Sequence, residues 1–197
     1  MNYFWRCLMC VLLCVSTQLS VWAEDGKFER SSSQKAVGYS TDVLLVGMPL
    51  ATLTGVLIER DWTGLVQGTY TAALTAGVTV LLKYTVKEDR PDHSNFHSFP
   101  SGHSSTTFAT AAFVQRRYGW KLGTPAYVLA TYTAWGRVFA KKHHWWDVIA
   151  GAAIGTGSAY LFTRPWAAER ELTITPMTMT DPVTDTPFFG LSASFTL

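Results

Sequence analysis

Two adjacent histidines, His143 and His144, lie between Arg137 and Asp147. Neighbouring side chains point in different directions on any regular backbone, so we expect at most one imidazole to serve a given site. Asp147 follows the first histidine by four residues and the second by three, and both spacings share a helical face. A carboxylate that accepts the proton of one ring nitrogen leaves the other nitrogen with a free lone pair. The segment therefore predicts a nucleophilic histidine, and the spacing alone leaves open which of the two it is.

Two further clusters contain residues that such a nucleophile would need around a phosphate. In the stretch KYTVKEDRP, Lys83 and Arg90 supply two cations. In PSGHSS, Ser101 is placed to cap a helix whose first backbone N–H groups, from residue 102 onward, would point at a bound anion. Gly102 allows close approach of the backbone, and His103 is placed to protonate a leaving oxygen as a general acid.

Each cluster by itself also has a purely structural interpretation. Lys83 and Arg90 could be solvated loop charges, Ser101 only a helix cap, and Arg137 and His143 the cations that are favoured at a helix C-terminus. Taken together, the lysine and the two arginines could surround a tetrahedral oxyanion, with the arginines binding through paired N–H groups. Fixed donors of this kind stabilise the charge that develops during phosphoryl transfer. The combination therefore predicts a phosphate site.

The three clusters, in this order and spacing, resemble the three signature motifs of the type 2 phosphatidic acid phosphatase superfamily, over residues 83 to 147. The resemblance implies that His143 is the nucleophile that becomes phosphorylated, that Asp147 orients it, and that His103 is the acid. It also implies a set of phosphate-binding residues: Lys83, Arg90, Ser101, Gly102 and Arg137. The mechanism that the family implies uses no cofactor and no metal ion, and we see no cluster with metal-ligand spacing.

One position departs from the family pattern. Serine usually precedes the arginine of the third motif, and here that residue is Gly136. The change could loosen the backbone or remove one hydrogen bond, while the main phosphate ligands stay in place.

Five apolar segments rich in Ala, Gly, Thr and Leu must position these motifs. Small residues let helices approach closely, and we expect an all-α helical bundle of the type 2 phosphatidic acid phosphatase kind with about five core helices. The segments are Val43–Ile58, Leu65–Leu82, Ser104–Val114, Pro125–Ala140 and Val148–Phe162. The links at 59–64 and 115–124 are predicted to be tight connections. The polar link at 83–102 is long, which is typical of a functional or disordered loop.

Composition divides the chain into four parts. Residues 1–23 resemble a secretory signal peptide, with Arg6 before an apolar stretch and a cleavage pattern ending at Ala23, and an uncleaved first membrane helix is the alternative. Residues 24–41 are a polar lead-in that we expect to be exposed, and residues 42–164 form the phosphatase-like domain. Residues 165–197 are a tail that alternates apolar and polar residues, interrupted by prolines, and predict a short hairpin or an extended strap.

Composition also excludes other classes of function. All three cysteines lie within residues 1–23, so the cleaved protein would have no disulfide or thiolate chemistry. The formal net charge is only +2 at pH 7, whereas a nucleic-acid-binding protein shows a strongly basic face. We therefore expect no nucleic-acid partner.

The apolar segments favour a membrane protein. If all five span a bilayer, both motif-bearing loops lie on the outer face, and the basic loop QRRYGWK faces the cytoplasm, as the positive-inside rule requires. We therefore expect a bacterial inner-membrane enzyme whose active site faces the periplasm. A soluble or peripheral periplasmic enzyme is the alternative, because several segments are short for a span.

The expected activity is hydrolysis of a phosphomonoester or pyrophosphate on a lipid, through a phosphohistidine intermediate. Undecaprenyl pyrophosphate, phosphatidate and lipid A are the candidate lipid-linked substrates, and the sequence does not choose among them. The alternatives are a soluble non-specific acid phosphatase, a vanadium-dependent haloperoxidase, and a non-catalytic envelope protein whose loop only binds an anion. The chain lacks the large extra helical framework of the haloperoxidases, and its oligomeric state stays open.

Overall fold

The computed structural model describes residues 30–166 and the two strands 172–180 and 187–195. The predicted signal peptide, residues 1–23, and the start of the predicted lead-in lie outside the described residues. The chain divides into two compact units, residues 1–164 and 165–197, and each is considered by itself.

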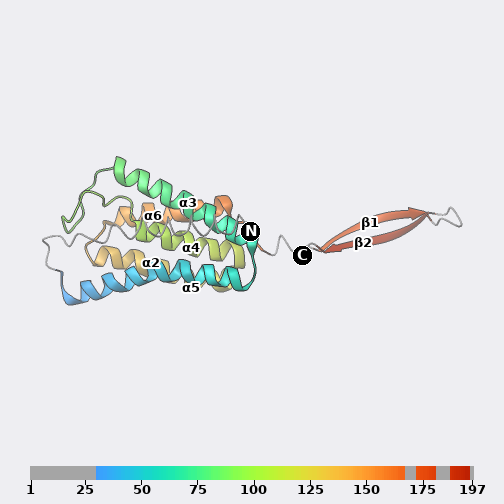
Figure 1. Ribbon diagram of the computed structural model, residues 1–197, viewed down its shortest axis with the longest axis horizontal. Coiled ribbons are helices and arrows are strands. Elements are labelled where there is room, and N and C mark those ends of the chain that lie inside the picture. The colour runs from blue at the N-terminus through green and yellow to red at the C-terminus, as the bar shows by residue number, and fades with distance from the viewer. Residues whose placement is uncertain (1–29, 167–171, 181–186, 196–197) are drawn as a thin grey trace. The chain divides into compact units, whose positions relative to one another are not determined.

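The described part of the first unit is a bundle of five helices, which confirms the predicted fold class (Figure 1). Consecutive helices run in opposite directions, so the loop at 86–101, the segment at 140–144 and the start of α2 lie at the same end of the bundle. The helices are α2 (Ser32–Ile58), α3 (Trp62–Thr85), α4 (Gly102–Tyr118), α5 (Trp120–Phe139) and α6 (Trp145–Phe162).

Helix α4 is the centre of the bundle and packs against each of the other four helices. Its buried positions are mostly small, and the helix α6 approaches it very closely at two glycines. A Cβ atom on Gly151 would lie 2.6 Å from the carbonyl oxygen of Ser101, and one on Gly155 would lie 2.1 Å from that of Ser105. Because these backbones nearly touch, the second and third motifs are held together by direct helix packing.

Helix α2 begins earlier than the sequence predicts. Ser31 caps it by accepting a hydrogen bond from the backbone N–H of Gln34, and the Gln34 side chain accepts from the Ser31 N–H in return. The Gln34 side chain also donates to the backbone oxygen of Phe139 at the end of α5. Residues 32–41 of the predicted lead-in are therefore helical and pack against α5 on one side, while Ser32, Lys35 and Tyr39 remain exposed as predicted.

The connection predicted at 115–124 is tight, as expected, but much shorter than those bounds. Helix α4 continues to Tyr118, and α5 begins at Trp120. Gly119 alone separates them, with a φ of 89° that favours glycine, and its N–H closes α4 by donating to the backbone oxygen of Gln115.

The opposite end of the bundle is held by a buried ion pair. Asp61, the N-cap of α3, accepts hydrogen bonds from Nε and Nη2 of Arg117 at 2.7 and 2.5 Å, and from the Tyr118 hydroxyl at 2.9 Å. Burial alone would raise the pKa of Asp61, but the hydrogen bonds from Arg117, the Gly64 N–H and Tyr118 outweigh it and lower this pKa. Arg117, which the sequence assigns to a basic loop, is in fact buried at the junction of α3, α4 and the end of α6.

By length and composition, two of the five helices in residues 30–166 could cross a membrane, α2 and α3. Both carry large apolar side chains on their exposed surface, such as Val43 and Leu50 on α2 and Tyr70 and Leu81 on α3.

The described part of the second unit is an antiparallel hairpin of β1 (Leu172–Thr180) and β2 (Pro187–Phe195). The sequence left open whether the tail is a hairpin or an extended strap, and the described strands form a hairpin. Pro176 lies inside β1, opposite Leu191, and does not end the strand as the sequence suggests. A two-stranded sheet consists of edge strands, where a residue without an N–H is tolerated.

Candidate active site

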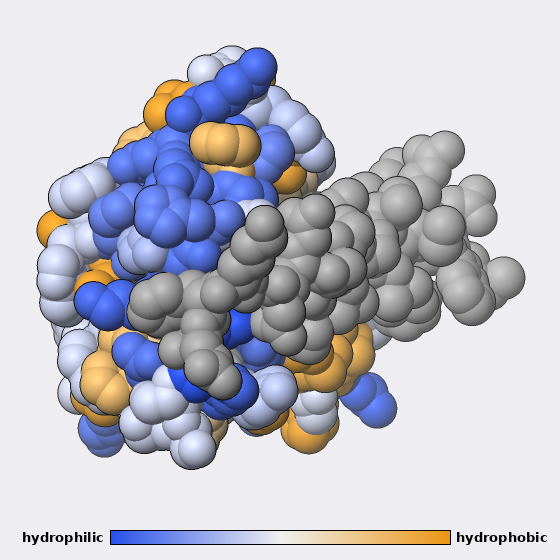
Figure 2. Space-filling view, turned by 90° about the vertical axis from the view of Figure 1, so that its left-hand side faces the viewer, coloured by the Kyte–Doolittle hydropathy of each residue, from blue (hydrophilic) through white to orange (hydrophobic). Residues whose placement is uncertain are grey.

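The three motifs meet at the end of the bundle that holds the loop 86–101. Figure 2 views this end directly and shows hydrophilic residues gathered on it, with hydrophobic residues around them. Lys83 lies in the last turn of α3, His103 in the first turn of α4, and Arg137 in the last turn of α5. Because antiparallel helices place these turns at the same level, motifs that are far apart in the sequence become neighbours.

His143 lies in the short segment before α6 and is almost fully buried. Its Nδ1 is 3.4 Å from Oδ2 of Asp147, without the geometry of a hydrogen bond. The spacing suggested a shared helical face, but α6 begins only at Trp145, and His144 is its N-cap. The pair therefore forms across a helix start, and this arrangement directs Nδ1, and not Nε2, toward the carboxylate.

The carboxylate of Asp147 is completely buried and held by two donors. Its Oδ2 accepts a 2.5 Å hydrogen bond from the Ser98 hydroxyl and a 2.8 Å hydrogen bond from the backbone N–H of His144. The backbone oxygen of Asp147 accepts from the N–H of Ser101, which joins the third motif to the second. Sequence reasoning missed Ser98, because a serine in a polar loop carries no signal of its partner.

Burial lowers the pKa of His143 well below its usual value, and the charges of Arg90, Lys83 and Arg137 lower it further. His143 is therefore neutral at pH 7 and keeps a lone pair on the nitrogen that faces away from Asp147. The same interactions place the three predicted phosphate-binding cations within electrostatic reach of this imidazole. Lys83 is additionally fixed by donating to the backbone oxygen of His97 at 3.0 Å.

The second motif starts α4 as predicted. Ser101 is the N-cap, and its hydroxyl accepts a hydrogen bond from the Ser104 N–H. The next two N–H groups, of Gly102 and His103, lie in the first turn, where an α-helix leaves them without intrahelical acceptors. The Ser104 N–H already donates to the Ser101 hydroxyl, so two of the three predicted backbone donors are left for an anion.

A residue outside all three motifs, Asp42 on α2, contacts two of them. Its Oδ1 lies 2.8 Å from Nε2 of His103 and accepts a 2.8 Å hydrogen bond from Nη1 of Arg137. The Nε of Arg137 has no hydrogen-bond partner among the described residues. Sequence reasoning missed Asp42 because it lies at the boundary between the polar lead-in and the first apolar segment, where an acidic residue is ordinary.

Gly136, the departure from the family pattern, lies where α2 and α5 come closest near the site. A Cβ atom here would lie 2.6 Å from Cγ2 of Thr41 and 3.0 Å from Cγ1 of Val37. The glycine therefore admits α2 beside Arg137, and the expectation of a looser backbone does not hold at this packed position.

A second carboxylate–cation contact links the two motif-bearing loops. Nζ of Lys142 lies 3.2 Å from Oδ2 of Asp92, and the aspartate is buried. Since Lys142 directly precedes the candidate nucleophile, this pair fixes the loop 86–101 against the segment that carries His143.

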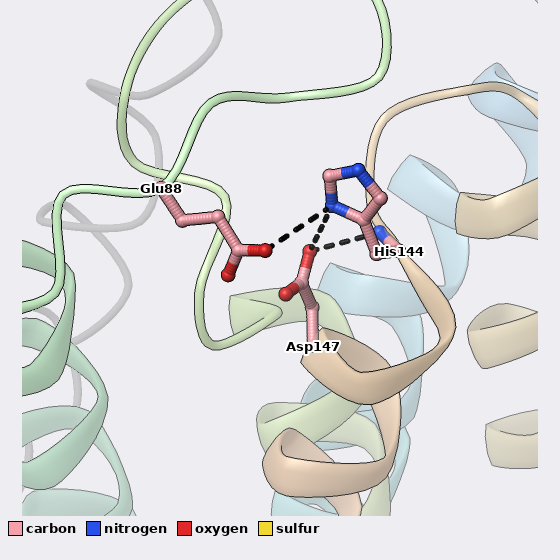
Figure 3. Close-up of side chains that lie close together, drawn as sticks. All are labelled: Glu88, His144 and Asp147. Atoms are coloured by element: carbon pink, nitrogen blue, oxygen red, sulfur yellow. Dashed lines mark hydrogen bonds and ion pairs between the residues drawn. The ribbon is translucent and has the colours of Figure 1, made fainter.

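Nδ1 of His144 faces the carboxylates of Glu88 and Asp147 (Figure 3). Its Nδ1 lies 3.6 Å from Oε1 of Glu88 and 3.6 Å from Oδ2 of Asp147, and its ring stacks on Trp146. Three ligand atoms of Glu88, His144 and Asp147 lie within 4.8 Å of one another, so these residues could hold a metal ion. Oε1 of Glu88 already accepts a hydrogen bond from Nε1 of Trp146, and Oδ2 of Asp147 already accepts one from Ser98. We therefore assign the cluster to packing the start of α6.

The assembled site groups cationic side chains and helix N-terminal N–H groups around the candidate nucleophile. Lys83, Arg90 and Arg137 converge on a neutral imidazole, and the start of α4 adds backbone donors. Such an arrangement suits a phosphoryl group, whose charge is stabilised by fixed cations and N–H groups.

Comparison with known proteins agrees with this chemistry. The family model of the PAP2 superfamily matches residues 64–171, which is more than half of the chain. The chain therefore belongs to the PAP2 superfamily, the type 2 phosphatidic acid phosphatases, and is a phosphatase of that class. The resemblance inferred from the three motifs is confirmed.

The curated relatives include lipid A phosphatases of Helicobacter pylori. The lipid A 4'-phosphatase of strain J99 is 35% identical over 134 residues, covering 62% of this chain and 68% of the relative. The lipid A 1-phosphatase of strain 26695 is 33% identical over 122 residues, covering 55% of this chain and 62% of the relative. Among solved structures, Aquifex aeolicus LpxE matches with a TM-score of 0.59 and 17% identity, covering 69% of this chain and 88% of that chain, and supports the fold.

Proposed function

We propose that this chain removes a phosphate group from a membrane lipid, with lipid A as the leading substrate class, through a phosphohistidine at His143. The observation that carries the proposal is the buried His143 beside Asp147, within electrostatic reach of Lys83, Arg90 and Arg137. The names of the Helicobacter relatives favour lipid A among the lipid phosphates.

In the first step, the lone pair on Nε2 of His143 attacks phosphorus, and a P–N bond forms while the bond from phosphorus to the ester oxygen breaks. The proton stays on Nδ1, which faces the carboxylate of Asp147, and the negative charge of Asp147 stabilises the positive imidazole that results. The side chain of His103 donates a proton to the leaving oxygen, which departs as an alcohol.

In the second step, water attacks the phosphohistidine. The imidazole of His103, now neutral, takes a proton from the water as the new P–O bond forms and the P–N bond breaks. Inorganic phosphate leaves, and both histidines return to their starting states. The cations hold the phosphoryl oxygens through both steps.

Several surface features support a lipid substrate presented at a membrane. Exposed tryptophans lie at both ends of the bundle, Trp62 and Trp120 at one end and Trp145 and Trp146 at the other. Aromatic rings at two levels are typical of the two interfaces of a bilayer. With α2 and α3 as spans, the candidate site lies at the level of the lipid headgroups, where a lipid phosphate is found.

An apolar groove between α2, α3 and α4 also supports a lipid substrate. It has a volume of 160 Å³, and its lining includes Leu45, Ala72 and Phe113. Leu45 lies one helical turn from Asp42, and Thr106, also in the lining, lies one turn from His103. An acyl chain in this groove would run from the site toward the middle of the membrane.

The orientation is proposed from the sequence alone. The basic stretch at 116–121 is placed on the cytoplasmic side and the candidate site on the periplasmic side, although ion pairing of Arg117 with Asp61 leaves Arg116 and Lys121 as the charges that support it. Washing membranes with salt separates this proposal from a soluble phosphatase, since activity released without detergent would contradict an integral protein.

The experiment that tests the proposed function measures phosphate release from lipid A, phosphatidate and undecaprenyl pyrophosphate in detergent micelles. We expect turnover of lipid A, lost by more than about a thousandfold in His143→Ala. His93→Ala is the matched control, because His93 is exposed and pairs with Asp89 away from the site. Full activity in a folded His143→Ala variant would refute the phosphohistidine, and turnover of only the other two lipids would refute the substrate class.

A further inference from the structure

The carboxylate of Asp42 gives the site a second histidine–aspartate pair. One oxygen of Asp42 contacts both the candidate acid and a candidate phosphate ligand, His103 at 2.8 Å and Arg137 at 2.8 Å. The side chains of His103 and Arg137 are nearly buried, whereas that of Asp42 is 26% exposed. Asp42 is therefore the most exposed of the three side chains.

His103 is otherwise surrounded by groups that disfavour a proton on its ring. Arg137 approaches from α5, Arg90 from the loop 86–101, and His143 from the segment before α6. Burial is the largest of these effects, and the pKa of His103 falls to about 4 even though the carboxylate of Asp42 opposes the shift. Among the described residues, the anion that contacts His103 is Asp42 on α2. This contact matters because an acid catalyst must carry its proton when the substrate arrives.

We propose that Asp42 is a positioning residue for the general acid: it favours the protonated form of His103 against the surrounding cations and fixes the direction of the Nε2–H. The inference rests on the proposed function. When the substrate enters, its ester oxygen replaces Asp42 as the acceptor of this N–H. The proton then passes to the oxygen as the P–O bond breaks, and the attacking water restores it in the second step.

The packing of α2 supports this assignment independently. Thr41, next to Asp42, lies against Gly136, where a side chain on the glycine would collide with it. The hydroxyl of Thr41 also accepts from Nη1 of Arg137 at 3.4 Å. Close approach at this one glycine is what brings the carboxylate within reach of both His103 and Arg137.

The test compares two substrates that differ in how much their leaving oxygen needs a proton. An alkyl phosphate leaves as a poorly stabilised alkoxide, whereas p-nitrophenyl phosphate leaves as a stabilised phenolate. In Asp42→Asn, we expect kcat/KM to fall by about a hundredfold for the alkyl phosphate and by less than about threefold for p-nitrophenyl phosphate. Asp42→Glu, which restores the charge, should recover part of the loss.

Asp89→Asn is the matched control, because Asp89 is an exposed carboxylate that pairs with a histidine outside the site. Equal losses on both substrates would overturn the proposal, since Asp42 would then act on phosphate binding or on folding. Unchanged or improved turnover would overturn it too, since the carboxylate would then merely occupy an empty phosphate site. Binding of orthovanadate shows that each variant is folded, and His143→Ala in the same assays reports separately on the proposed function.

Discussion

The Ser98 hydroxyl donates a 2.5 Å hydrogen bond to Oδ2 of Asp147, across 49 residues of sequence. The bond ties the loop after α3 to the first turn of α6. Asp147 is fully buried, and its other oxygen has no hydrogen-bond partner among the described residues, so this contact is a large part of what holds the carboxylate near His143.

Removing that hydroxyl should slow the reaction. We expect Ser98→Ala to lower kcat/KM by about ten- to a hundredfold, because a hydrogen bond to a buried charged group contributes about 1.5–3 kcal/mol. The loss should appear in kcat rather than in KM, since Ser98 acts through Asp147. Ser33→Ala, on the exposed first turn of α2, is the control, and equal activity of the two variants would contradict the role given to Ser98.

The pH dependence of activity should reflect the environment of His143. Burial and the three nearby cations lower its pKa, so the neutral nucleophile persists at pH values where a free imidazole would be protonated. We expect the acidic limb of the pH profile of kcat/KM to lie well below pH 6.5, which is about the ordinary pKa of a histidine side chain. Arg90→Gln removes one of the cations and should move the limb to higher pH, and a limb that does not move would contradict this electrostatic account.

The ion pair of Asp61 and Arg117, at the end of the bundle opposite the candidate site, should affect stability and not catalysis. Asp61→Ala leaves Arg117 buried without its partner, and we expect a loss of about 3–5 kcal/mol in the free energy of unfolding. Because the pKa of Asp61 is lowered in the folded state, its stabilisation is present above its unfolded pKa and is lost as the pH falls through the folded value.

Denaturant unfolding in micelles, with Glu59→Ala as an exposed acidic control on the same loop, measures this effect. Activity per folded molecule should be unchanged, since the site lies at the other end of the bundle. A specific activity that falls together with stability would indicate coupling between the two ends.

Two glycines of α6 provide a paired test of the α4–α6 contact. Gly155→Ala places a Cβ atom 2.1 Å from the backbone oxygen of Ser105, and we expect it to cost about 1–3 kcal/mol of stability. Gly157 has no atom within 4 Å of its Cβ position, so Gly157→Ala should be neutral or stabilising by up to about 1 kcal/mol. Thermal unfolding compares them, and equal melting temperatures would show that the helices separate at little cost.

The predicted chemistry depended on motifs whose residues are few and closely spaced. Lys83 and Arg90, the Ser101 cap, and the segment from Arg137 to Asp147 could be recognised without coordinates, because each is a short stretch of the sequence. The helix boundaries were harder. The start of α2 and the single-residue junction at Gly119 depend on a capping box and one backbone angle, which hydropathy does not reveal.

The sequence by itself determined the family, the helical bundle and the residues that the phosphate site would need, because short motifs and apolar periodicity are local properties of the chain. Tertiary structure alone decided which partners those residues meet. Ser98 reaches Asp147 and Asp42 reaches His103 and Arg137 only because antiparallel helices bring their ends together. A side chain's partner across the bundle depends on how closely helices pack, as at Gly136, and that distance is fixed by the whole core rather than by neighbours in sequence.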